Sequence, residues 1–187
     1  MNIKRSLCRW TLHVLGWKIR LEGDYIPKCV VCVAPHTSNV DFMMGKLFYN
    51  AIGRKAKFLI KKEWFVFPLS IILRSMGGIP VNRSKSSSST ELLAEEFARR
   101  EVFHLAIAPE GTRKKAKEWK SGFYYIALKA GVPILLAYFD YKKKEVGIKT
   151  TFYPTGNAEE DIYAIRSMYN GVTGFHNKNF EKLNSTE

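Results

Sequence analysis

The stretch CVVCVAPHTSNVDF, residues 29–42, joins an apolar run to a short polar segment. The run before Pro35 is rich in β-branched residues and predicts a strand over residues 28–34. The polar segment contains Ser38 and Asn39, either of which is a suitable N-cap for a following helix. This stretch therefore predicts a strand, a loop and a helix in direct succession.

The same alternation continues along the chain and is typical of an α/β fold with a mostly parallel sheet flanked by helices. The other expected strands cover residues 57–61, 78–81, 102–108, 133–139 and 146–153. The expected helices cover residues 39–52, 63–75, 90–100, 122–130 and 158–169. Short polar segments follow several of these strands, and open α/β sheets bind their ligands at strand ends.

Length and charge set broad limits on the class of protein. The chain has 187 residues, which suits a single domain with one core, and we expect that domain over residues 21–187. Lys and Arg number 30 against 17 Asp and Glu, so the formal net charge is +13. This charge predicts an anionic partner and does not rank nucleic acid, acidic lipid, a phosphorylated substrate or an acidic carrier protein.

Residues 1–20 have the pattern of an amphipathic helix. Apolar residues recur at steps of four and three: Ile3, Leu7, Trp10, Val14 and Trp17. Basic residues fall mostly elsewhere around the helix: Lys4, Arg5, Arg9 and Lys18. Such a helix can lie in a membrane interface or pack on the core of its own domain, and the pattern fits both equally well. No uncharged apolar run approaches the ~20 residues that span a bilayer, so we expect the protein on the cytoplasmic side.

The three cysteines, Cys8, Cys29 and Cys32, favour a reducing compartment, because their number is odd and the chain is too long to need disulfides. Cys29 and Cys32 have the spacing of a redox motif, but they lie inside the apolar run, and we expect them in the core. The sequence contains no obvious cluster of metal ligands, and we expect neither a metal nor a cofactor.

His36 and Asp41 are the first candidates for chemistry. Five residues on a regular helix leave two side chains about 140° apart, so the pair can meet only if Asp41 lies in the first turn of the helix, beyond a turn. The carboxylate then accepts from one ring nitrogen, and the other nitrogen can take a proton from a hydroxyl. A structural histidine is the alternative that this motif alone leaves open. We expect the other histidines to be structural: His13, His104 and His176.

A second polar segment is EGTR at residues 110–113, directly after a strand. Gly111 permits a tight turn, and Glu110 and Arg113 present opposite charges. Four lysines make the segment electropositive: Lys114, Lys115, Lys117 and Lys120. An arginine at a strand end suits a phosphate, although a solvated basic surface is the alternative. Arg83 closes the expected strand 78–81 in a comparable position.

In order and spacing, these segments resemble the four sequence blocks of the glycerolipid acyltransferase superfamily, especially the lysophosphatidic acid (1-acylglycerol-3-phosphate) acyltransferases. The first block, H-x-x-x-x-D, is met by His36 and Asp41. The second block, a glycine, an apolar strand and an arginine, is met by Gly78, Ile79, Val81 and Arg83. The third, E-G-T-R, is met by Glu110, Gly111, Thr112 and Arg113. The fourth, a strand opening with V-P, is met by Val132 and Pro133.

The resemblance implies transfer of a fatty acyl group from a thioester to the hydroxyl of a lysophospholipid, with 1-acylglycerol-3-phosphate as the first candidate and phosphatidate as the product. His36 is then the general base, and Asp41 holds its tautomer. Glu110 is expected to orient Arg113 or to bind a glycerol hydroxyl. The residues expected to bind or shape the phosphate site are Arg83, Glu110, Gly111, Thr112, Arg113 and Lys61.

The implied partners follow from that chemistry. The acyl donor is acyl-coenzyme A or acyl carrier protein, and the sequence does not choose between them. A membrane lipid substrate implies a monotopic protein at the cytoplasmic face of the cell membrane, with residues 1–20 and 64–73 against an anionic surface. The alternatives are another hydroxyl-bearing lysolipid as acceptor, a thioester hydrolase, and a non-enzymatic basic module for anionic lipid or nucleic acid. No nucleic-acid motif is recognisable, so nucleic acid is not expected.

Overall fold

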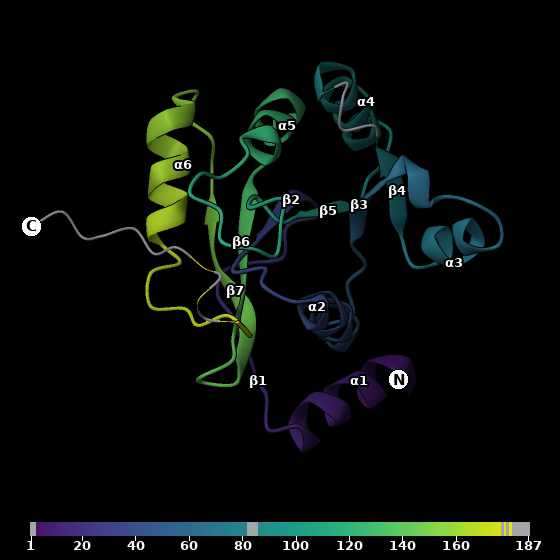
Figure 1. The fold of residues 1–187 in the computed structure, drawn as a ribbon, viewed down its shortest axis with the longest axis vertical. Coiled ribbons are helices and arrows are strands. Elements are labelled where there is room, and N and C mark those ends of the chain that lie inside the picture. The colour runs from purple at the N-terminus through teal and green to yellow at the C-terminus, as the bar shows by residue number, and fades with distance from the viewer. Residues whose placement is uncertain (1–2, 82–85, 177, 179, 181–187) are drawn as a thin grey trace, which may run out of the picture.

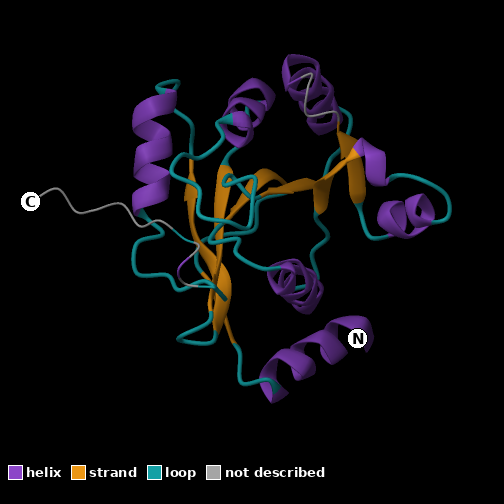
Figure 2. Ribbon diagram, viewed as in Figure 1, coloured by secondary structure: helices purple, strands orange, loops and turns teal. Residues whose placement is uncertain are grey.

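A computed structural model describes residues 3–81, 86–176, 178 and 180, which are built around one seven-stranded sheet (Figures 1 and 2). The strands are β1 (Lys18–Leu21), β2 (Lys28–Val33), β3 (Lys57–Lys61), β4 (Gly78–Val81), β5 (Phe103–Ile107), β6 (Ile134–Asp140) and β7 (Glu145–Phe152). Their order across the sheet is β1-β7-β6-β2-β5-β3-β4. Neighbouring strands pair in parallel except β6 and β7, so the predicted mostly parallel α/β class is confirmed.

Helices cover both faces of the sheet (Figure 1). They are α1 (Ile3–Val14), α2 (Asn39–Ala51), α3 (Leu69–Ser75), α4 (Ser86–Ala98), α5 (Gly122–Ala130) and α6 (Ala158–Ser167), with a 3-10 turn at Lys62–Trp64. One hydrophobic core lies between the sheet and the α4, α5 and α6 side. The other lies between the sheet and the α1 and α2 side.

Strand β2 contributes to both cores, as its sequence indicates. Cys29 and Val31 pack in the core beside α1 and α2, and Val30 and Cys32 pack in the other. This alternation is the two-residue period of a strand that is buried on both faces. Burial raises the pKa of the Cys29 thiol to about 12, although Arg54 opposes the shift. The prediction that these cysteines belong to the core is confirmed.

The predicted helix over residues 1–20 is too long. The helix ends at Val14, and Gly16 follows with a φ of 77°, a left-handed conformation that stops a helix and suits glycine. The chain then enters β1, which pairs in parallel with β7. A Cβ on Gly147 of β7 would lie 2.1 Å from the carbonyl oxygen of Arg20, so this close pairing requires glycine there.

Two other boundaries also differ from the sequence prediction. The helix expected over residues 63–75 is interrupted, because Pro68 precedes a shorter α3 that begins at Leu69. Helix α4 begins at Ser86, before the expected start at residue 90, since serine is only modestly unfavourable in a helix. Across the described residues, no helix combines the length and apolar character that crossing a membrane requires.

Candidate active site

The candidate site lies where three neighbouring parallel strands end. His36 follows β2, Glu110 follows β5 and Tyr141 follows β6. Strand β2 pairs in parallel with both β5 and β6, so the carboxyl ends of all three lie at one edge of the sheet. The fold thus brings together side chains that are about 70 to 100 positions apart in the sequence. This is the place where open α/β sheets form ligand sites.

Helix α2 begins with a capping box that also orients the carboxylate of Asp41. Ser38 is the N-cap, and its Oγ accepts from the backbone N–H of Val40 at 3.2 Å. Asp41, in the first turn, accepts from the backbone N–H groups of Thr37 and Ser38 at 2.7 and 2.8 Å. These bonds satisfy backbone donors at the helix start and fix the carboxylate in place. Of the two N-caps predicted, Ser38 takes the role.

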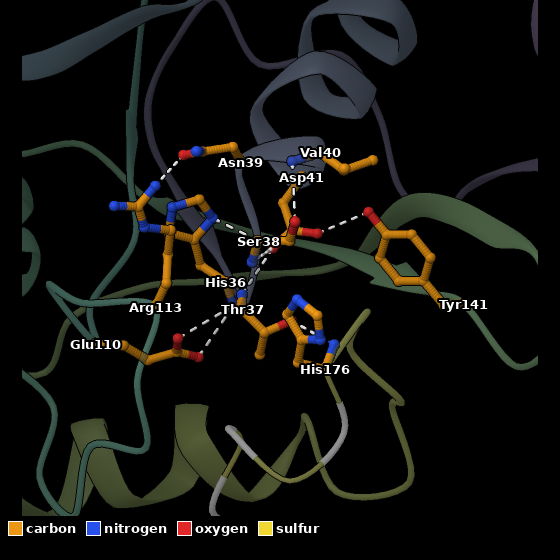
Figure 3. Close-up of polar contacts among 10 residues, drawn as sticks. All are labelled: His36, Thr37, Ser38, Asn39, Val40, Asp41, Glu110, Arg113, Tyr141 and His176. Carbon is orange, nitrogen blue, oxygen red and sulfur yellow. Dashed lines mark hydrogen bonds and ion pairs between the residues drawn. The ribbon is translucent and has the colours of Figure 1, made fainter.

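His36 and Asp41 meet across the turn before α2, an arrangement that their spacing allows (Figure 3). Nδ1 of His36 lies 3.5 Å from Oδ2 of Asp41, whose side chain is 1% exposed against 25% for the imidazole. Burial raises the pKa of Asp41, but hydrogen bonds from His36, Tyr141 and the backbone outweigh it and leave the pKa below its ordinary value. Asp41 is therefore a buried carboxylate that can hold one imidazole tautomer, while the partly exposed ring is open to a substrate.

Glu110 supports the loop that carries His36. Its two carboxylate oxygens accept from the backbone N–H of His36 at 3.2 and 3.1 Å, and the residue is 4% exposed. Burial raises the pKa of Glu110 to about 8, and the nearby charge of Asp41 adds to this shift. The predicted contact with Arg113 is not how the carboxylate is used: it faces the His36 backbone, because the ends of β5 and β2 are adjacent.

Gly111 allows the EGTR loop to turn tightly. Its φ is 63°, and a Cβ there would lie 2.8 Å from Cε of Lys120. Thr112 accepts from the backbone N–H of Lys114 through Oγ1 at 3.2 Å, which orders the next part of the loop. The EGTR segment therefore presents Arg113 and Lys114 on a compact turn.

Beside the His–Asp pair, the EGTR loop and the start of α2 form an open pocket of about 440 Å³. Its lining residues are Thr37, Ser38, Asn39, Thr112, Arg113, Lys114 and His176. The guanidinium of Arg113 donates to Oδ1 of Asn39, which ties the EGTR loop to the helix start (Figure 3). Two cationic side chains at one pocket make it suitable for a phosphate group.

The structure also brings in two residues whose place at the site the sequence did not indicate. Tyr141 donates from its hydroxyl to Oδ1 of Asp41 at 2.6 Å, and the backbone N–H of His176 donates to Oγ1 of Thr37 at 3.1 Å. Tyr141 follows a strand end, as the predicted site residues do, and that position was the available signal. His176 follows α6 and lines the pocket, and its expected structural role stays a prediction.

The remaining residues singled out in the sequence are Arg83, Lys61 and His104. Arg83 lies outside the described residues. Lys61 ends β3 and is exposed, and it is not one of the described residues that line the pocket. His104 is a buried structural residue as predicted, with Nε2 2.8 Å from the carbonyl oxygen of Ile26 and Nδ1 3.3 Å from the Tyr49 hydroxyl. Within the described part of the chain, no three His, Cys, Asp or Glu residues form a group that could hold a metal ion.

A mostly parallel α/β sheet with a His–Asp pair at a strand end, beside a basic pocket, is the arrangement that the four sequence blocks imply. The sequence matches the model of the Acyltransferase family over residues 18–139, and the chain belongs to that family. The predicted resemblance to the glycerolipid acyltransferase superfamily is thereby confirmed.

Two relatives show how far this similarity extends. The human 1-acyl-sn-glycerol-3-phosphate acyltransferase beta is 30% identical over 140 residues, which are 72% of this chain and 49% of the human protein. The chain thus spans about half the length of that curated relative. The crystal structure of the 1-acyl-sn-glycerophosphate (LPA) acyltransferase PlsC from Thermotoga maritima has a TM-score of 0.57 at 17% identity, covering 91% of this chain and 80% of that one. At this identity the likeness shows the fold.

Proposed function

We propose that this protein transfers a fatty acyl group from a thioester to the hydroxyl of a lysophospholipid, with 1-acylglycerol-3-phosphate as the first candidate and phosphatidate as the product. The observation that carries the proposal is the His36–Asp41 pair, which lies beside a pocket lined by Arg113 and Lys114. The names of the two relatives agree with this substrate class.

The geometry suggests a direct transfer. Asp41 accepts from Nδ1–H of His36 and so keeps Nε2 unprotonated as the general base. The acceptor hydroxyl gives its proton to Nε2 while its oxygen attacks the thioester carbonyl carbon. The C–S bond then breaks, and the leaving thiolate takes the proton back from the imidazolium. The loop that carries His36 keeps its position because Glu110 accepts a hydrogen bond from the backbone N–H of His36.

The acceptor's phosphate is assigned to the pocket beside the pair. Arg113 is held by Asn39, so its guanidinium is already oriented for an anion, and Lys114 adds a second positive charge. Thr112 and Gly111 set the turn that carries both side chains. Arg83 and Lys61 remain proposed contacts for the same substrate.

We place the protein at the surface of a membrane, at its cytoplasmic face. Helix α1 buries Leu12 and packs on α2, which leaves most of its predicted apolar stripe exposed. The exposed apolar side chains of this stripe are Ile3, Leu7, Trp10 and Val14, and Leu15 follows them. A second exposed group surrounds α3: Trp64, Val66, Phe67, Ile71 and Ile72. Apolar side chains on a chain with a net charge of +13 suit an anionic lipid surface.

The reaction class is tested by incubating the protein with labelled acyl-coenzyme A or acyl carrier protein, with and without a panel of lysolipids in mixed micelles. The proposal expects acyl release that depends on the acceptor, and lysophosphatidate as the best acceptor. Release that is equally fast without an acceptor would make the protein a thioester hydrolase. A complete lack of acyl release with every donor and lysolipid would leave a basic module that binds anionic lipid.

A further inference from the structure

Tyr141 contacts the proposed catalytic pair directly and yet lies just beyond residues 18–139, the stretch that matches the family. We propose that Tyr141 is a positioning residue that holds the Asp41 carboxylate in the orientation needed to support His36. This inference rests on the proposed function, because it gives the tyrosine its purpose in acyl transfer.

The two oxygens of Asp41 have separate partners. Oδ2 takes the backbone N–H groups of Thr37 and Ser38 and lies 3.5 Å from Nδ1 of His36. Oδ1 takes the hydroxyl of Tyr141 at 2.6 Å (Figure 3). A carboxylate held at both oxygens cannot turn about its side-chain bond. The Tyr141 bond to Oδ1 therefore adds to the two backbone bonds in keeping Oδ2 directed at the imidazole.

The tyrosine is itself held by segments from both ends of the chain. Its ring meets Trp17 edge to face, with centroids 5.0 Å apart, and Phe175 in the same way at 5.2 Å. Its backbone N–H donates to the carbonyl oxygen of Thr173 at 2.9 Å. Two aromatic edges and a backbone bond fix the direction of the phenol. The packing of the ring thus holds the hydroxyl in an orientation that directs it at Asp41.

The charges around the contact favour a donating phenol. Burial raises the pKa of Tyr141 well above its ordinary value, and the Asp41 carboxylate raises it further, so the hydroxyl keeps its proton. The Asp41 carboxylate also raises the pKa of the nearby Glu110. A neutral donor beside a buried carboxylate forms a charge-assisted bond, stronger than one between neutral groups.

The first test is Tyr141→Phe, which removes the hydroxyl and keeps the ring packing. A lost hydrogen bond to a charged group predicts a fall in kcat of about tenfold, with the KM of donor and acceptor nearly unchanged. The matched control is Tyr124→Phe, because the Tyr124 hydroxyl donates to the buried carboxylate of Asp161 at 2.7 Å, between α5 and the start of α6. That variant should lower the melting temperature and leave kcat unchanged. An unchanged kcat in Tyr141→Phe would overturn the proposal.

A double-mutant cycle separates positioning from a general loss of structure. If Tyr141 acts through Asp41, then adding Tyr141→Phe to Asp41→Ala should lower kcat by less than about twofold further. A further tenfold loss in the Asp41→Ala background would show that the tyrosine acts by another route, and the proposal would fail.

A measurement without turnover keeps this inference distinct from the proposed function. In protein labelled with ¹⁵N-histidine, the ring signals of His36 are assigned by their loss in His36→Ala. Tyr141→Phe should shift the His36 Nδ1 signal, and Tyr124→Phe should leave it in place. An unmoved signal in Tyr141→Phe would overturn the positioning role even if acyl transfer is found. If the protein shows no acyl transfer, the proposed function is refuted, and the His36 signal still tests whether Tyr141 positions Asp41.

Discussion

At the scale of single residues, the site depends on backbone N–H groups as much as on side chains. Asp41 binds the N–H groups of Thr37 and Ser38, and Glu110 binds that of His36. These bonds fix the backbone of residues 36–38 and therefore the position from which the imidazole projects. The residues that hold the loop are themselves buried, so their effects reach beyond catalysis to stability.

Glu110 makes stability depend on pH. Its pKa is about 8 in the folded protein, raised by burial from an ordinary value of 4.5. A raised carboxyl pKa means that the folded state keeps a proton that the unfolded state has lost. The free energy of unfolding should therefore fall as pH rises between about 4.5 and 8, by up to about 1.4 kcal/mol per pH unit. Urea unfolding at several pH values measures this slope.

Glu110→Gln removes the titrating group, so its free energy of unfolding should depend less steeply on pH than that of the wild type. Glu118→Gln is the control, because Glu118 is exposed and lies in the same loop region. Parallel pH profiles for wild type and Glu110→Gln would contradict the buried, protonated carboxyl.

Arg113 should act in binding, not in the chemical step. Arg113→Ala removes the guanidinium from the pocket and should raise the KM for lysophosphatidate about tenfold or more, with a smaller change in kcat. Steady-state kinetics over a range of acceptor concentrations measures both constants. Lys117→Ala is a suitable control, since it removes an equal charge nearby from a residue that does not line the pocket. A loss confined to kcat would contradict a binding role.

At the scale of elements, α1 has two different faces. Leu12 is buried and Cys8 packs partly against the same core, whereas Leu7 and Trp10 are exposed. The helix therefore packs on the core through one face, and its exposed face is the one that we propose contacts the membrane. Trp17, which the pattern placed in the apolar stripe, packs on Tyr141, because the helix ends before it.

The exposed face of α1 predicts binding to lipid vesicles. The double variant Leu7→Ser, Trp10→Ser should bind anionic vesicles at least about tenfold more weakly, because both side chains lose their apolar burial in the interface. Co-sedimentation with vesicles of phosphatidylglycerol and phosphatidylcholine measures the change. Tyr153→Ser, at an exposed position after β7, should leave binding unchanged. Equal binding by all three proteins would show that α1 does not contact the membrane.

At the scale of the whole molecule, the sheet topology assembles the site. Because β2 lies between β5 and β6, loops from three distant parts of the sequence meet at one edge. Apolar runs and turn residues were enough to predict the sheet class and six of the strands, since these depend on local pattern. The spacing of His36 and Asp41 allowed the two to meet but left a structural histidine open until the family blocks were considered. The family blocks then placed the EGTR loop beside them.

Contacts between distant segments were beyond local pattern. Strand β1 was missed because the short KIRL segment is mostly exposed and is defined by its pairing with β7. Tyr141 and His176 were missed as site residues because their partners lie 100 and 139 positions away. The orientation of Glu110 toward the His36 backbone likewise depends on the adjacency of β2 and β5.

The central claim is that His36 is the base of an acyl transfer. It is tested most directly by measuring transfer of a labelled acyl group from acyl-coenzyme A and acyl carrier protein to lysophosphatidate, with wild type and His36→Ala side by side. The proposed function predicts phosphatidate from the wild type and a rate about 10²–10⁴-fold lower in the variant. The melting temperature should be unchanged, because the imidazole is partly exposed. Equal rates in the two proteins would contradict the claim.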